Sequence, residues 1–188
     1  MKGSRMHQEL LRELSVITEE EQKILDGRQE IDPQIYTEKK DMVIDSGKLL
    51  QRGKLIQVRP HTRFVHFPEH THNYIEVIYM CQGSTTHILN GREVVLKQGD
   101  LLFLNQNAVQ EILPAGKDDI AVNFIILPEF LDTAFEMMGK EENQLRDFLV
   151  GALCGRDGET GWMYFHVADI LPVQNLIENM VWTIFYDS

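Results

Sequence analysis

The pattern of apolar and polar positions divides the chain into three parts. Residues 1–50 are charged and have a helical period, residues 51–127 form short apolar runs, and residues 128–188 return to a helical period. Short runs rich in Val, Ile, Phe, Tyr and Thr, separated by Gly and Asn, are typical of strands. Strands at such even spacing indicate a barrel or sandwich. The runs predict strands at 54–59, 63–67, 74–81, 86–89, 92–96, 100–104, 109–113 and 120–127.

Local signals define one hairpin and two N-terminal helices. Asn90-Gly91 separates two of the predicted strands, and this pair tolerates the positive φ angles of a type I′ turn. Thr18 and Glu21 have the spacing of a capping box, in which each side chain bonds the other residue's backbone N–H. Helices are therefore predicted at about 5–16 and 19–26, and 27–50 is predicted to be an irregular arm.

The C-terminal part predicts helices at 130–138 and 143–149, a loop at 154–161, a strand at 163–167 and a last helix from about Pro172. In the last helix, residues spaced i, i+3, i+4 and i+7 predict one buried stripe. These residues are Val173, Leu176, Ile177, Met180, Val181, Ile184 and Phe185.

Trp182 and Tyr186 fall on the opposite side of that helix. An exposed Trp often has a partner surface, so these two residues are candidates for a dimer interface. Packing of Trp182 under the N-terminal arm is the alternative. Either arrangement buries the indole ring.

Composition limits the function classes. The 188 residues carry a net charge of −11, which argues against this stretch gripping a nucleic-acid backbone. The two cysteines, Cys81 and Cys154, form no CxxC motif, and the N-terminus has no signal-peptide pattern. We therefore expect a soluble, cytoplasmic protein that does not cross a membrane.

His70, His72, Tyr74 and Glu76 alternate, so on one strand they share one face. Two imidazoles and a carboxylate can coordinate a divalent metal. Alternatively, they form hydrogen bonds in a polar barrel mouth. His66 and His87 are interpreted as hydrogen-bonded strand residues, not as ligands.

The spacing His70-x-His72-x3-Glu76-x6-Gly83 resembles the first cupin motif, and Gly99 opens a stretch similar to the second. Phe64 stands in place of the family's leading Gly, and Gln110 in place of its third metal-binding His. An amide oxygen is a poorer ligand for a transition metal than imidazole. We therefore expect no cofactor. A divalent metal held by His70, His72 and Glu76 is the alternative.

Residues 70–112 further resemble the N-terminal domain of AraC-type transcription regulators. The resemblance implies a mainly β fold with flanking helices: a cupin-type double-stranded β-helix, or jelly-roll barrel, at 51–127. An N-terminal arm at 1–50 and a C-terminal helical region at 128–188, with a dimerisation helix, flank the barrel.

That resemblance also implies a sensor, not an enzyme. The partners would be a small-molecule effector, such as a sugar, a second copy of the chain, and DNA through a helix-turn-helix domain beyond Ser188. A stand-alone metal-dependent cupin enzyme, a dioxygenase or a sugar isomerase or epimerase, is the alternative. The candidate pocket residues are His70, His72, Tyr74, Glu76, Phe103, Asn105 and Gln110. Arg59 and Arg63 could attract an anionic ligand, although strand arginines more often pair with carboxylates.

Overall fold

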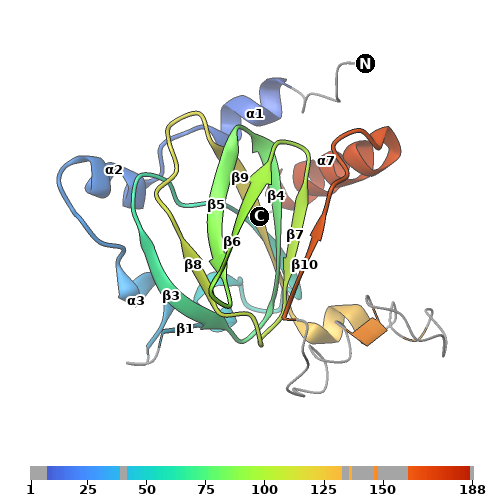
Figure 1. The fold of residues 1–188 in the computed structure, drawn as a ribbon, viewed down its shortest axis with the longest axis horizontal. Helices are drawn as coiled ribbons and strands as arrows, with labels where there is room; N and C mark the ends of the chain where they lie inside the picture. Colours follow the sequence, from blue (N-terminus) through green and yellow to red (C-terminus); the bar gives the residue numbers. More distant parts are fainter. Residues whose placement is uncertain (1–7, 39–41, 133–135, 137–145, 148–160, 187–188) are drawn as a thin grey trace.

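The computed structural model describes residues 8–38, 42–132, 136, 146–147 and 161–186. Two five-stranded sheets face each other and form the barrel (Figure 1). The first sheet contains, in spatial order, β1 (Val43–Ile44), β3 (Phe67–His72), β8 (Gln110–Ile112), β5 (Ser84–Leu89) and β6 (Arg92–Lys97). The second contains β10 (Trp162–Phe165), β7 (Leu101–Leu104), β4 (Ile75–Gln82), β9 (Ile120–Ile126) and β2 (Ile56–Pro60).

The predicted mainly β architecture is confirmed, and so is the predicted hairpin. β5 and β6 pair in antiparallel register from Leu89↔Arg92 to Ser84↔Lys97. Between them Asn90 and Gly91 have φ angles of 50° and 80°. Both values are positive, as the type I′ turn requires.

The strand predicted at 63–67 is wrong. The chain bends irregularly through residues 61–66, and β3 begins only at Phe67. Phe64 has a φ of 69°, a left-handed conformation that an extended strand does not accommodate, and its N–H donates to the carbonyl of Ala115.

The expectation that His70 and Glu76 lie on one strand is also wrong. β3 ends at His72, and β4 begins at Ile75 in the other sheet. The alternation rule therefore does not relate the two residues, because a corner of the chain separates them.

The N-terminal part contains helices α1 (Gln8–Leu14), α2 (Glu19–Leu25), α3 (Pro33–Tyr36) and α4 (Ser46–Leu49). The capping box at the start of α2 is confirmed, with both reciprocal hydrogen bonds present. The prediction that residues 27–50 form an irregular arm is wrong. It contains two short helices and a strand, β1, that pairs in parallel with β3. The segment also buries Ile31, Tyr36, Ile44 and Leu49 against the barrel.

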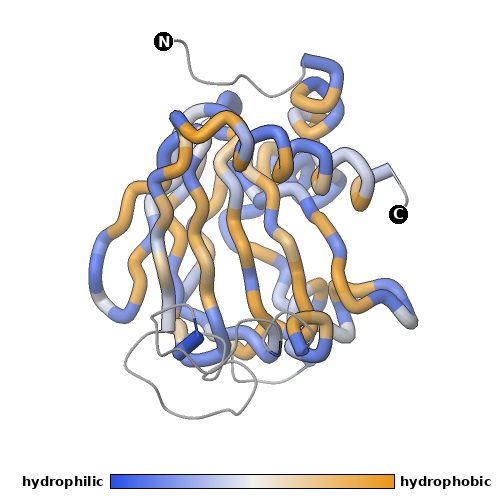
Figure 2. Tube along the Cα trace, turned by 90° about the vertical axis from the view of Figure 1, so that its right-hand side faces the viewer, coloured by the Kyte–Doolittle hydropathy of each residue, from blue (hydrophilic) through white to orange (hydrophobic). Residues whose placement is uncertain are grey.

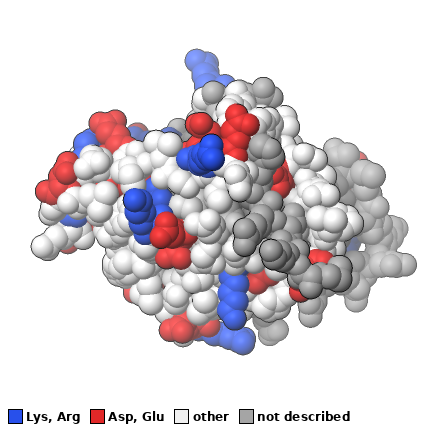
Figure 3. Space-filling model, turned by 90° about the horizontal axis from the view of Figure 1, so that it is seen from above, with Lys and Arg blue, Asp and Glu red and all other residues white. Residues whose placement is uncertain are grey.

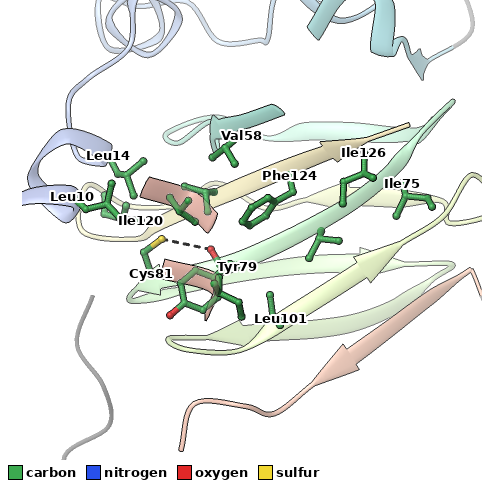
Figure 4. Packing of buried hydrophobic residues seen from close by; sticks show 14 residues of the cluster. Leu10, Leu14, Val58, Ile75, Tyr79, Cys81, Leu101, Ile120, Phe124 and Ile126 are labelled. Carbon is green, nitrogen blue, oxygen red and sulfur yellow. Dashed lines mark hydrogen bonds between the residues drawn. The ribbon is translucent and has the colours of Figure 1, made fainter. Parts of the chain in front are cut away.

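Hydrophobic residues are buried on both faces of the second sheet. Ile75, Val77, Tyr79 and Cys81 point outward and pack under α1 and α7 (Leu171–Tyr186), as the labelled residues in Figure 4 illustrate. The alternate residues Ile78 and Met80 point into the barrel. Both faces of β4 are therefore buried, and Figure 2 shows largely hydrophobic colouring along the central strands.

The stripe predicted for the last helix is partly wrong. Ile177 and Val181 are buried, but Leu176 is 61% exposed and Met180 is 37% exposed. Gln174 takes a core position because its amide bonds buried groups of the barrel. None of the described helices is both long and apolar enough to cross a bilayer.

Other C-terminal expectations are only partly testable. The strand predicted at 163–167 corresponds to β10, which begins one residue earlier and ends two residues earlier. A short 3-10 helix, η1, covers Pro128–Leu131. The helices predicted at 130–138 and 143–149, the loop at 154–161 and Cys154 lie mostly or wholly outside the described residues.

Candidate functional site

A cavity of about 50 Å³ lies between the two sheets. The N-terminal segment contributes Tyr36, Ile44 and Leu49 to its wall. The sheets and the bend before β3 contribute Arg59, Pro60, His61, Thr62, Phe67, His70, His72, Tyr74, Glu76, Ile112, Asn123 and Ile125. The cavity wall thus combines apolar side chains with a cluster of imidazole, amide and carboxyl groups.

Asn123 is the polar centre of this cluster. It interrupts the apolar strand β9, where its register partners are Arg59 on β2 and Ile78 on β4. Its Nδ2 donates to Oε1 of Glu76 at 2.9 Å, and its Oδ1 lies 2.9 Å from Nδ1 of His61. Since an amide oxygen accepts, Nδ1 of His61 carries the proton and Nε2 is the acceptor.

Glu76 is buried, and burial raises its pKa to about 8, although the hydrogen bond from Asn123 acts in the opposite direction. The group is therefore mostly protonated at neutral pH. Its Oε2 lies 3.4 Å from Nε2 of His72. Burial also holds the pKa of His72 well below its ordinary value. Both groups are consequently neutral, and their contact is not an ion pair.

The imidazole of His70 is fixed by the backbone. Its Nδ1 donates to the carbonyl of Pro68 at 2.7 Å, and burial lowers its pKa to about 4. The rings of Phe67, His70, His72 and Tyr74 form a continuous series, with successive centroids 4.5, 5.0 and 4.9 Å apart. One wall of the cavity is therefore a row of neutral aromatic rings.

A second polar layer lies beneath the cavity. His87 is fully buried; its Nδ1 lies 3.0 Å from Nε2 of Gln110 and its Nε2 lies 2.8 Å from Oγ1 of Thr85. Both ring nitrogens are thus engaged, which confirms its interpretation as a hydrogen-bonded strand residue. His66 is bonded as well, to the carboxylate of Glu111 at 2.7 Å, but it lies in the bend before β3, so its prediction as a strand residue is wrong.

Four buried atoms of these two layers have no hydrogen-bond partner among the described residues. They are His61 Nε2, His72 Nδ1, Glu76 Oε2 and Gln110 Oε1. Buried polar atoms are normally paired, so such a concentration points to a polar ligand or ordered water.

The sequence found part of this site. His70, His72, Tyr74 and Glu76 do line the cavity, and Gln110 lies below it, paired with His70 in the register of β3 and β8. Two other candidates lie elsewhere. Phe103 pairs with Val77 on the outward face and contacts Phe165, and Asn105 accepts the backbone N–H of Asn107 in the turn after β7.

Sequence reasoning missed Asn123 and His61. It considered Arg59 as an arginine that could attract an anionic ligand but did not include it among the candidate pocket residues. A signal was available for Asn123, because an amide within the apolar run 120–127 is unusual for a core strand. No comparable signal exists for His61, since its position depends on the bend between β2 and β3.

The residues present do not fit the metal site that the cupin resemblance offers. Across the described residues, no three His, Cys, Asp or Glu side chains are grouped closely enough to hold a metal ion. The hydrogen bonds of His70 Nδ1 to Pro68 and of Asn123 to Oε1 of Glu76 leave one atom of each side chain for another partner, but Gln110 occupies the third His position and its amide is a poor ligand for a transition metal. The described side chains therefore lack the grouped donor set that a metal at His70, His72 and Glu76 requires.

Comparisons with known proteins agree with the barrel. Residues 56–139 match the model of the AraC-like ligand binding domain. A 56-residue segment is 32% identical to the HTH-type transcriptional activator RhaS of Pectobacterium carotovorum, over 30% of this chain and 20% of that protein. A 74-residue segment is 32% identical to the HTH-type transcriptional activator RhaR of Klebsiella pneumoniae, over 39% and 26% respectively.

Among solved structures, apo ToxT K231A from Vibrio cholerae superposes with a TM-score of 0.51 at 10% identity. The match covers 71% of this chain and 49% of that protein, and supports the cupin-type fold alone. The sequence matches span about a quarter or less of the curated relatives' length.

Proposed function

We propose that the chain is the effector-sensing part of a bacterial transcription regulator, because residues 56–139 match the model of the AraC-like ligand binding domain. The matched relatives are transcriptional activators of the HTH type. By this proposal DNA is contacted by a further, basic domain of the regulator, because this chain is acidic overall. On the face in Figure 3, acidic and basic side chains lie next to one another without a continuous basic surface.

The cavity is the observation that carries the proposal. A sensing pocket needs apolar walls that remove water and a few polar groups that orient the ligand. Here Ile44, Leu49, Ile112 and Ile125 supply apolar wall, and the unpartnered nitrogen and oxygen atoms supply the polar groups. A small, hydroxyl-bearing metabolite suits this mixture because a hydroxyl group both donates and accepts.

The N-terminal segment forms part of the cavity wall. Pockets for small molecules commonly measure ~300–1,000 Å³, several times the volume found here. An effector the size of a sugar therefore needs wall residues to move. Tyr36, Ile44 and Leu49 are the candidates, because they line the cavity and β1 is an edge strand of the first sheet, with α3 beside it (Figure 1). We propose that the effector binds by displacing or reordering Tyr36, Ile44 and Leu49 and the described residues around them, 31–38 and 42–50.

Dimerisation is the second part of the proposed role. Trp182 and Tyr186 lie on the outer side of α7, 37% and 47% exposed, with ring centroids 4.7 Å apart. Trp and Tyr are enriched among the central residues that contribute most to binding in protein interfaces. We propose that α7 contributes these rings to a homodimer.

The enzyme alternative has no comparable support. The described residues lack a grouped metal-binding set, and the matched relatives are regulators. The polar atoms of the cavity are therefore interpreted as ligand-binding groups.

The test is a thermal-shift screen of metabolites against three proteins. Besides the unmodified chain, we use His72→Phe, which keeps a ring of similar size without nitrogens, and His66→Gln, which alters an exposed histidine outside the cavity. A ligand at a hundredfold excess over Kd stabilises by about 2.7 kcal/mol. We expect a hit that stabilises the unmodified chain and His66→Gln but not His72→Phe. A complete screen without a hit, or equal stabilisation of His72→Phe, would contradict the sensing role.

A further inference from the structure

Two arginines four positions apart have different surroundings. Arg63 is buried, and its Nε and Nη2 donate to the two carboxylate oxygens of Glu21 at 2.7 and 2.8 Å. Arg59 is half-buried in the cavity wall and makes no ion pair or hydrogen bond through its guanidinium with any residue that the structure describes. Arg63 is thus a structural residue, whereas the guanidinium of Arg59 can bind a ligand.

The strand register directs Arg59 inward. Its neighbour Val58 pairs with Phe124 and packs in the outer cluster, so Arg59, which pairs with Asn123, faces the opposite way. Asn123 bonds Glu76 and His61 on the same side. The guanidinium therefore belongs to the cluster that carries the unpartnered atoms.

The cavity wall contains no anion to balance this charge. Its single carboxyl group is Glu76, whose pKa burial raises to about 8, so it is mostly neutral at neutral pH. Glu20, which reaches the wall residue Tyr36, accepts that residue's hydroxyl hydrogen at 2.6 Å and is not paired with Arg59. The formal positive charge of Arg59 therefore has no ion pair among the described residues, and at this half-buried position a bound counter-charge is stabilised more strongly than in bulk water.

Resting on the sensing role proposed above, we propose that the effector is a small hydroxy acid whose carboxylate binds Arg59. The planar guanidinium matches a carboxylate through two parallel hydrogen bonds. The hydroxyl groups of such a ligand would bond Nε2 of His61 and Nδ1 of His72, which have no other partner among the described residues. A neutral sugar would satisfy these nitrogens but leave Arg59 without a partner, and a cation would be repelled.

The experiment compares ligands that differ only in the carboxylate. Lactate is paired with propane-1,2-diol, and galacturonate with galactose, in calorimetric titrations of the 188-residue chain. The variants are Arg59→Gln, Arg59→Lys and the control Arg52→Gln, which alters an exposed arginine outside the cavity wall.

We expect the acid of a pair to bind at least tenfold more tightly than its neutral counterpart. Arg59→Gln should weaken binding of the acid by about 10- to 100-fold and leave the neutral compound unchanged, because a charge-assisted hydrogen bond is lost. Arg59→Lys should retain part of the preference, and Arg52→Gln all of it. Because Arg59 has no partner to lose, melting temperatures in the absence of ligand should stay close to that of the unmodified chain.

Two outcomes separate this inference from the sensing role. Equal affinity for acid and neutral compound, or an acid preference that survives Arg59→Gln, overturns the hydroxy-acid inference and leaves effector sensing intact. If neither pair binds, the titrations are repeated with the hit from the metabolite screen and with the matching compound that has, or lacks, a carboxylate. The same criteria then apply to this new pair. If the screen also gives no hit, the sensing role itself fails.

Discussion

The hydroxyl group of Tyr79, on the outer face of β4, donates a hydrogen bond of 2.7 Å to Oε1 of Gln174 on α7. Nε2 of the same amide donates to the carbonyl oxygens of Gly99 and Val167, at 2.7 and 2.8 Å. Since Glu76, at the start of β4, faces the cavity, this amide ties the proposed dimer helix to a strand of the proposed effector site.

Gln174→Leu should destabilise the fold by about 2–4 kcal/mol, because it leaves a buried phenol and two carbonyl groups without partners. Equilibrium denaturation in urea measures the change. Asn175→Leu is the control, since Asn175 is exposed on the same helix and its substitution should cost far less. Equal losses in the two variants would show that the hydrogen bonds of the Gln174 amide do not stabilise the fold.

The buried pair of Glu21 and Arg63 attaches α2 to the barrel. Glu21→Gln should cost about 3–5 kcal/mol, since it leaves a buried guanidinium without its counter-charge. Glu19→Gln, which alters an exposed residue of the same helix, is the matched control. A loss below 1 kcal/mol in urea denaturation would contradict this role for the pair.

The same pair predicts an acid limb in the stability profile. Burial raises the pKa of Glu21, but the hydrogen bonds from Arg63 and Thr18 outweigh it and hold the pKa below its ordinary value of 4.5. The carboxylate's contribution is thus complete above pH 4.5 and lost as the pH falls through the lower folded pKa. Glu21→Gln should therefore lose less stability than the unmodified chain below pH 4.5, as denaturation at pH 3 and pH 6 would reveal.

The features that the sequence predicted depend on local signals, whereas those that it did not predict depend on contacts between distant residues. The turn at Asn90-Gly91 and the capping box at Thr18 each depend on a few adjacent residues, and both were found. The cavity depends on contacts between residues far apart in sequence, such as His61 with Asn123. Alternation identified His70 and Glu76 as cavity residues but placed them on one strand, because the corner between β3 and β4 leaves no periodic trace.

The sequence also did not predict which of the two arginines forms an ion pair. Arg59 and Arg63 were indistinguishable as strand arginines, yet only Arg63 meets a carboxylate. The reason is that Glu21 comes from α2, 42 positions away, and the packing of that helix selects its partner.

Glu76 should make stability fall as the pH rises. Its folded pKa of about 8 lies above its ordinary value of 4.5, so the native state holds a proton that the unfolded state releases between these values. Within that window the contribution of Glu76 declines by up to about 1.4 kcal/mol per pH unit. Glu76→Gln removes this decline, so its stability relative to the unmodified chain should increase from pH 5 to pH 8. A constant difference in unfolding free energy between the two proteins would contradict a raised pKa.

The buried histidines act in the opposite direction at lower pH. Burial lowers the pKa of His70 to about 4 from 6.5, so its neutral form stabilises the fold above pH 6.5 and this contribution is lost as the pH falls towards 4. His70→Gln should remove part of that acid sensitivity. Denaturation at pH 5 and pH 7 measures it, with the exposed His66→Gln as control. The same pH difference in His70→Gln and the unmodified chain would count against a depressed pKa.

Substitution of Trp182 is the most direct test of the proposed dimer interface. Trp182→Ala should weaken self-association by about 2–4 kcal/mol, the range of a central aromatic residue in an interface, and shift sedimentation towards monomer. Val16→Ala serves as the matched control, because Val16 is 62% exposed and lies in the turn after α1, outside α7. The fold itself should tolerate Trp182→Ala, since the core of α7 rests on Ile177 and Val181. An unchanged dimer in this variant would remove the outer side of α7 from the interface, whereas loss of the dimer in Val16→Ala as well would move the contact towards α1.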